Sequence, residues 1–120
     1  YRKATTATTT PSRPRYETNM AYNVVILESA QYEYEAIVRY LAQILMNPRA
    51  AGNFVAEFEY QLDLLREQPL LRPLSHIREL AARNYRSFTV NKYVCLYKFE
   101  RDTIYIAHVF HQSQDYGRLV

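Results

Sequence analysis

The chain has 120 residues, with 15 lysines and arginines against 12 acidic residues, so its formal net charge is +3. This length fits one domain, and a hydrophobic content of 48% predicts a folded chain. Two glycines exclude the glycine-rich phosphate loops of nucleotide-binding proteins, and one cysteine, Cys95, excludes an internal disulfide framework. A single cysteine is typical of the reducing cytoplasm. We therefore expect a cytoplasmic domain without a cofactor.

The longest apolar stretch covers residues 36–46, but it contains Arg39 and stops at Asn47-Pro48. A membrane-crossing helix needs roughly 20 apolar residues, so this stretch is well short of that length. No signal peptide is recognisable either. The sequence therefore predicts no association with a membrane.

Basic and acidic residues are unevenly distributed along the chain. Residues 1–19 carry four basic side chains and one acidic side chain, whereas residues 20–120 are neutral overall. Within this neutral part, residues 28–63 have a net charge of −4 and residues 66–101 a net charge of +5. If these segments fold as separate layers, one surface would attract a polyanion. The alternative is ordinary solvated charge.

The first 27 residues contain a tail and then a strand. Residues 1–19 are threonine-rich, contain two prolines and follow no helical or strand period, so we expect a tail outside a domain that spans residues 20–120. Residues 22–27 are apolar at nearly every position, which predicts a strand buried on both faces.

Two long helices are expected next. Ser29 is the predicted N-cap of the first helix, with Glu33 in its first turn. The second helix starts at Pro48 and ends before Pro69. Because the connection at Asn47 is short, the two helices must form an antiparallel hairpin. The apolar stripes are Tyr34, Ile37, Val38, Leu41, Ile44 and Leu45 in the first helix, and Ala51, Phe54, Val55, Phe58, Leu62 and Leu65 in the second.

The apolar period changes to two in the C-terminal third of the chain. Residues 84–90, 93–100 and 103–110 are rich in Val, Ile, Tyr, Phe and Thr, and two-residue breaks of hairpin length separate them. This pattern predicts a three-stranded antiparallel meander. A strand, a helical hairpin and a meander together indicate an α+β fold, with the helices on one face of the sheet.

Two-residue loops also predict the pairing of these strands. The predicted pairs are Arg86–Tyr97, Phe88–Cys95, Tyr97–Ile106 and Cys95–His108. A slip of one residue in either loop would reverse the faces of the strands. An arginine in the middle of a sheet is costly to bury unless it is paired or reaches solvent, so Arg86 indicates a functional edge or a structural ion pair.

These spaced positions resemble the RelE/ParE superfamily of toxins from bacterial type II toxin–antitoxin modules, over roughly residues 21–120. The long helical hairpin is more similar to the ParE and plasmid-stabilisation branch than to the compact RelE branch. The residues that carry the resemblance are Ser29-Ala30, Tyr40-Leu41, Asn47-Pro48, Ala50-Ala51, Phe54, Leu65, Pro69, Tyr85-Arg86, Val90, Tyr93, Tyr97, Ile104, Ile106, Val109, His111, Asp115-Tyr116 and Leu119.

The resemblance implies a toxin that a cognate antitoxin neutralises by wrapping over it. ParE-like members poison DNA gyrase by binding, whereas RelE-like members cleave messenger RNA in the ribosome. We expect the ParE-like activity, with ribosome-dependent mRNA cleavage as one alternative and a non-toxic antitoxin-binding domain as another. The sequence leaves a homodimer open.

Metal-independent RNA cleavage would need a cation for the phosphate and groups that transfer protons. Arg86 matches the Tyr-Arg position of the superfamily, and its planar guanidinium suits a phosphate. His111 and Tyr116 are the candidates for proton transfer, and Arg83 and Lys92 are supporting cations for nucleic acid.

Each candidate also has a structural interpretation. Arg86 could form an ion pair, His111 could end a strand or contact the antitoxin, and Tyr116 could pack in the core. Residues 112–114 read Gln-Ser-Gln where nucleolytic relatives usually carry arginine or lysine, which argues against cleavage. Only two ligands, Cys95 and His108, are expected to face each other, whereas zinc normally takes at least three, so we predict no metal site.

Overall fold

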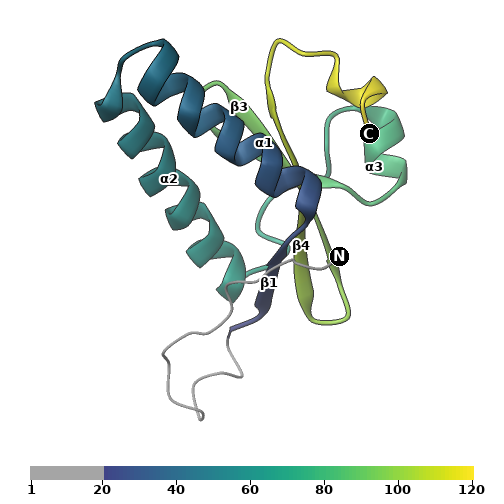
Figure 1. Cartoon of the computed structure of the whole chain (residues 1–120). Helices are drawn as coiled ribbons and strands as arrows, with labels where there is room; N and C mark the ends of the chain where they lie inside the picture. The colour runs from purple at the N-terminus through teal and green to yellow at the C-terminus, as the bar shows by residue number, and fades with distance from the viewer. Residues whose placement is uncertain (1–20) are drawn as a thin grey trace.

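The computed structural model describes residues 21–120, and its elements form an α+β fold in which a long helical hairpin lies beside a four-stranded sheet (Figure 1). The predicted order of strand, hairpin and meander is confirmed. The expected tail, residues 1–19, lies outside the described residues. The elements in chain order are β1 (Asn23–Ile26), α1 (Glu28–Arg39), a π-helical turn (Tyr40–Ile44), α2 (Pro48–Glu67), α3 (Arg78–Ala82), β2 (Arg86–Val90), β3 (Tyr93–Glu100), β4 (Thr103–His111) and a 3-10 helix (Tyr116–Arg118).

The strand order in the sheet is β1-β4-β3-β2, and β1 runs parallel to β4. This order places β1 at an edge. Within β1 only Val24 is buried, so the prediction of a strand buried on both faces was wrong. Apolar composition in a short segment does not distinguish an edge strand from a central one, because the partner strand lies 80 residues further along the chain.

The predicted pairing holds between β2 and β3 and in the first half of the β3–β4 hairpin, including the row Arg86, Tyr97 and Ile106. The pair Cys95–His108 was wrong, because the register shifts between Leu96 and Tyr97. A β-bulge leaves one extra residue on β4 at this point. Cys95 therefore lies opposite Val109.

Polar side chains of α1 cover this bulge. Ser29 was predicted as the N-cap, but the cap position is Leu27, and the Ser29 hydroxyl donates to the carbonyl of Ala107, the extra residue, at 2.8 Å. One turn later, the Glu33 carboxylate accepts from the backbone N–H of Val109 at 2.8 Å. Ser29 and Glu33 thus serve backbone groups near a site where the ladder is interrupted.

Aromatic rings join α2 to the sheet and to α1. Phe54 is completely buried, and its ring centroid lies 5.2 Å from that of Tyr93 on β3 and 5.5 Å from that of Tyr34 on α1. Phe58 packs 4.7 Å from Tyr34 and 6.1 Å from Phe88 on β2. At the start of α2, the Asn47 side chain accepts from the Ala50 N–H, as an N-cap does.

The first helix does not continue as an α-helix to Leu45. After Arg39 the chain forms the π-helical turn, in which the Leu45 N–H donates to the carbonyl of Tyr40, five residues earlier. A π-helical turn takes more residues than an α-helical one, so it rotates the following side chains away from the buried stripe. Ile44 and Leu45, both predicted to be buried, are therefore 67% and 51% exposed.

The opposite face of the sheet carries a second, smaller core. The short helix α3, which the proline-punctuated sequence did not reveal, packs there with the C-terminal segment, so the helices are not all on one face (Figure 1). This core contains Leu80, Tyr85, Val94, Leu96, Ala107, Phe110 and Tyr116. Within residues 21–120 no helix combines the length and the apolar character needed to span a membrane.

Candidate interaction groove

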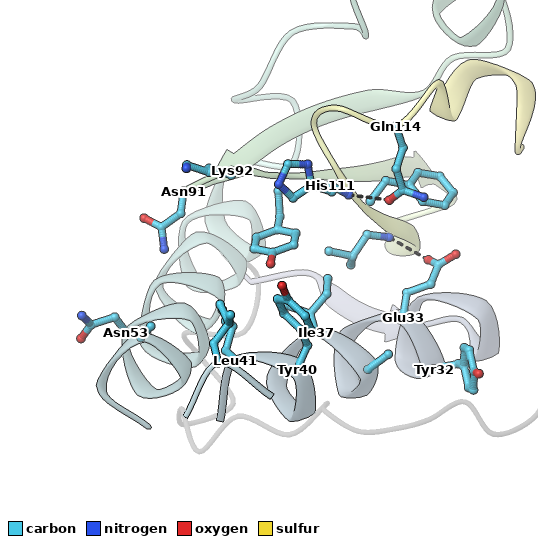
Figure 2. A pocket seen from close by; sticks show the side chains of 16 residues that line it. Tyr32, Glu33, Ile37, Tyr40, Leu41, Asn53, Asn91, Lys92, His111 and Gln114 are labelled. Atoms are coloured by element: carbon cyan, nitrogen blue, oxygen red, sulfur yellow. Dashed lines mark hydrogen bonds between the residues drawn. The ribbon is translucent and has the colours of Figure 1, made fainter. Parts of the chain in front are cut away.

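A groove of about 830 Å³ opens between the helical hairpin and the edge of the sheet formed by the start of β3 and the end of β4 (Figure 2). Its helical wall comes from α1, the π-helical turn and the start of α2, and its other wall from the β2–β3 turn and the end of β4. Apolar and aromatic side chains line most of it, with a few polar groups at the rim. The residues that matter below are Tyr32, Ile37, Tyr40, Leu45, Lys92, Tyr93 and His111.

Glu33 lies at one end of the groove and links its two walls. Besides the Val109 N–H, its carboxylate contacts Nδ1 of His108 at 3.1 Å. The Glu33 side chain is 23% exposed and that of His108 18%. Because the carboxylate accepts from two groups of β4, it fixes α1 against the sheet. Sequence reasoning placed Glu33 only in the first helical turn, since no local pattern reveals a partner 75 residues away.

His111 lines the groove, as does Lys92, so the structure brings these two predicted residues to the same cavity. The Ser113 N–H donates to Nδ1 of His111 at 3.0 Å, which makes this nitrogen a hydrogen-bond acceptor. The imidazole lies edge-on to the Tyr93 ring at 5.3 Å. Burial raises the pKa of Tyr93, and the nearby Tyr40 raises it further. Tyr93 therefore lines the groove as a neutral phenol at pH 7.

Arg86 lies outside the groove and is engaged elsewhere. Its guanidinium donates to the backbone carbonyl of Arg72 at 2.7 Å, and the backbone of Leu74 forms a bridge with Arg86 itself. In the same row, the Tyr97 hydroxyl donates to the carbonyl of Pro69 at 2.8 Å. Arg86 and Tyr97 thus hold the loop after α2 against the sheet, and the partner of the arginine is a carbonyl, not the ion pair that one interpretation predicted.

Tyr116 lies on the opposite face of the sheet. It is buried, and its ring stacks on that of Phe110 at a centroid distance of 5.9 Å. Burial raises the pKa of Tyr116. A general acid or base works best with a pKa near the operating pH, so this environment moves Tyr116 away from catalysis.

Arg83 also belongs to the opposite side. Its guanidinium carbon lies 5.4 Å from the ring centroid of Tyr85, and Nζ of Lys98 approaches the same ring at 4.5 Å. Tyr85 belongs to the second core, on the α3 side of the sheet. Arg83 therefore does not reach the groove that contains Lys92.

The separation of Arg86 from His111 can be estimated from the strand register. His111 pairs with Tyr93, which pairs with Val90, and Val90 is four residues from Arg86 on β2. At about 3.3 Å per residue the two rows are about 13 Å apart. The two side chains therefore start from distant rows of the sheet, and Arg86 is already bonded to the Arg72 carbonyl. The structure thus assembles two of the five predicted residues and leaves the other three apart.

The structure does not place the two possible metal ligands, Cys95 and His108, opposite each other. In Cys95, burial raises the pKa of the thiol well above the usual range. Among residues 21–120, no three His, Cys, Asp or Glu side chains are arranged to hold a metal ion.

Comparisons with known proteins agree with this architecture. The profile of the ParE toxin of the type II toxin–antitoxin system parDE matches residues 24–116. Among solved structures, a chain of the chromosomal ParDE TA system from P. aeruginosa is similar with a TM-score of 0.60 and 16% identity, over 77% of this chain and 96% of that chain. None of the curated proteins matches the sequence. The chain therefore belongs to the ParE toxin family and is the toxin component of a type II toxin–antitoxin system, whose partner is a cognate antitoxin.

Proposed function

We propose that this toxin inhibits DNA gyrase in the cytoplasm by binding to it and carries out no chemistry of its own. The observation that supports the proposal is the dispersal of the groups that RNA cleavage would need. Arg86 and His111 are about 13 Å apart along the sheet, and Tyr116 is buried on the opposite face. Cleavage requires proton-transfer groups and a cation around one phosphodiester.

The surroundings of each group also disfavour cleavage. Arg86 already donates to a backbone carbonyl, so a phosphate would have to compete for that hydrogen bond. Residues 112–114 are exposed beside His111, but they offer amides and a hydroxyl. Neutral groups stabilise the charge that develops on phosphate far less than cations do. Binding an essential enzyme makes none of these demands.

The groove is the surface that we assign to the antitoxin. Its apolar walls with a polar rim suit an amphipathic peptide segment, which could bury Ile37 and Tyr93 from opposite sides. Because Tyr40 and Leu45 belong to both the groove and the exposed hairpin connection, a bound antitoxin would also cover part of that connection. Neutralisation would then follow from covering the surface that contacts the target.

The proposal predicts that the purified toxin inhibits the supercoiling of relaxed plasmid by purified bacterial gyrase. Addition of the cognate antitoxin in equal amount should restore supercoiling, which controls for contaminating nucleases. In cells, induction without antitoxin should leave the 5′ ends of transcripts unchanged. Gyrase that stays fully active at high toxin excess, together with new transcript ends on induction, would instead establish the nuclease alternative.

A further inference from the structure

The connection between α1 and α2 exposes a cluster of large apolar side chains. We call it the hairpin tip and define it as Tyr40, Ile44, Leu45 and Met46, which are 46%, 67%, 51% and 76% exposed. In Figure 1 this connection lies at the upper end of the hairpin, far from the end of α2. Neighbouring exposed apolar residues are unusual on a protein that works alone, and they commonly mark an interaction site.

The backbone of the hairpin tip is unusual as well. The π-helical turn rotates Ile44 and Leu45 out of the core, and Met46 has a left-handed conformation with φ of 52°. Glycine or asparagine normally occupies such a position at the end of a helix, because a larger side chain is strained there. The chain instead places a fully apolar side chain there and exposes it. Strained residues of this kind cluster at functional surfaces.

The charges around the hairpin tip indicate what kind of surface it fits. Between residues 36 and 56 the charged residues are Arg39 and Arg49, both exposed. The seven acidic residues of the hairpin all lie outside this range, and they are Glu28, Glu33, Glu35, Glu57, Glu59, Asp63 and Glu67. An apolar patch flanked by two guanidinium groups complements an apolar depression bordered by carboxylates.

We propose that the hairpin tip is the surface by which the toxin docks on its target protein, at an apolar site bordered by carboxylates. This inference rests on the proposed function, because it assumes a target that is bound and not cleaved. A second copy of the chain is a poorer occupant, since a two-fold contact between tips would bring Arg39 and Arg49 of both copies together. Ile44 and Met46 do not line the groove, so they can be changed without altering its walls.

The test is the double variant Ile44→Ser/Met46→Asn in the supercoiling assay with purified gyrase. Asparagine tolerates the left-handed backbone, so the variant should keep the melting temperature and the antitoxin affinity of the wild type. We expect the toxin concentration for half-inhibition to rise at least tenfold. The matched control is Leu70→Ser/Leu71→Ser, which removes two leucines that are 58% and 40% exposed beyond the end of α2, and it should change that concentration less than twofold.

Each other outcome has a defined meaning. The inference is wrong if the tip variant inhibits gyrase at the same concentration as the wild type. It is also wrong if the variant loses only its binding to the antitoxin, or if the wild type is a dimer and the variant loses only dimerisation. If wild-type toxin arrests growth without affecting gyrase, the proposed target is wrong. In that case growth arrest tests the inference. The hairpin tip is the docking surface if the tip variant no longer arrests growth, and it is not the docking surface if the variant still arrests growth. If the tip variant has a lower melting temperature than the wild type, the variant Arg39→Glu/Arg49→Glu is tested in its place, with the same expected loss of inhibition. Unchanged inhibition by that variant would refute the docking surface.

Discussion

Replacing Phe54 with alanine is expected to reduce the free energy of unfolding by about 3–5 kcal/mol, a large share of the roughly 5–15 kcal/mol that stabilises a small domain. The side chain projects from α2 and is completely buried, with its ring against Tyr34 of α1 and Tyr93 of β3. Its removal deletes these apolar contacts and leaves a cavity that the helices and the sheet cannot close without moving. Urea denaturation followed by circular dichroism measures the loss.

Two further variants serve as controls for that measurement. Phe54→Leu retains most of the buried volume and should cost about 1–1.5 kcal/mol. Tyr60→Ala removes an aromatic ring from the same helix where it is 56% exposed, and it should change stability by less than about 0.5 kcal/mol. A Phe54→Ala protein within about 1 kcal/mol of the wild type would mean that the hairpin is not packed on the sheet through this residue.

Replacing Glu33 with alanine is expected to cost about 2 kcal/mol. The carboxylate accepts hydrogen bonds from the Val109 N–H and from His108, and bonds to a charged group contribute about 1.5–3 kcal/mol each before solvent exposure reduces them. The Val109 N–H would be left without its acceptor beside the bulge in β4. The free energy of unfolding, measured in the same denaturation experiment, tests this.

The exposed residue Glu35 supplies the comparison. It accepts a hydrogen bond from Gln31 on the surface of the same helix, so Glu35→Ala should cost less than about 0.5 kcal/mol. Glu33→Gln keeps an acceptor oxygen without the charge, and its stability should fall between those of the alanine variant and the wild type. Equal effects of the two alanine substitutions would show that Glu33 does not attach α1 to β4.

The elements that sequence periodicity located are those whose local pattern and tertiary environment agree. The stripe of α2 from Ala51 to Leu65 faces the core as predicted, except that Val55 is only partly buried. The two-residue turns of the meander place Arg86 opposite Tyr97. In both cases a strong period and a short connection leave few geometries for the chain.

The differences arise where one residue changes the phase of a pattern. One extra residue on β4 moves Cys95 from His108 to Val109, and a single π-helical turn exposes Ile44 and Leu45. Neither irregularity has a local signature such as glycine or proline in this chain. The bulge also forms hydrogen bonds with Ser29 and Glu33, which lie 78 and 76 residues earlier in the chain than their partners, so a reading of one segment at a time does not reveal it.

The prediction of the candidate site from the sequence was limited in the same way, because it depended on contacts between distant segments. Residue type alone made Arg86, His111 and Tyr116 reasonable partners in catalysis, but the sheet separates them by row and by face. Glu33, which joins the walls of the groove, has its partners 75 and 76 residues further along the chain. Of the hairpin tip, Ile44 and Leu45 were predicted to be buried because they continue the apolar stripe of the first helix, whereas both are exposed.

The most direct test of action by binding is growth arrest by the double variant His111→Asn/Tyr116→Phe, induced without antitoxin. Asparagine keeps an acceptor near the position of Nδ1, which receives the Ser113 N–H, and phenylalanine keeps the ring stacked on Phe110. Both candidate proton-transfer groups are removed. Docking predicts the same loss of colony-forming cells as the wild type, within about twofold. Loss of general acid–base catalysis would lower activity at least about 100-fold, so recovered growth would contradict a toxin that acts without chemistry.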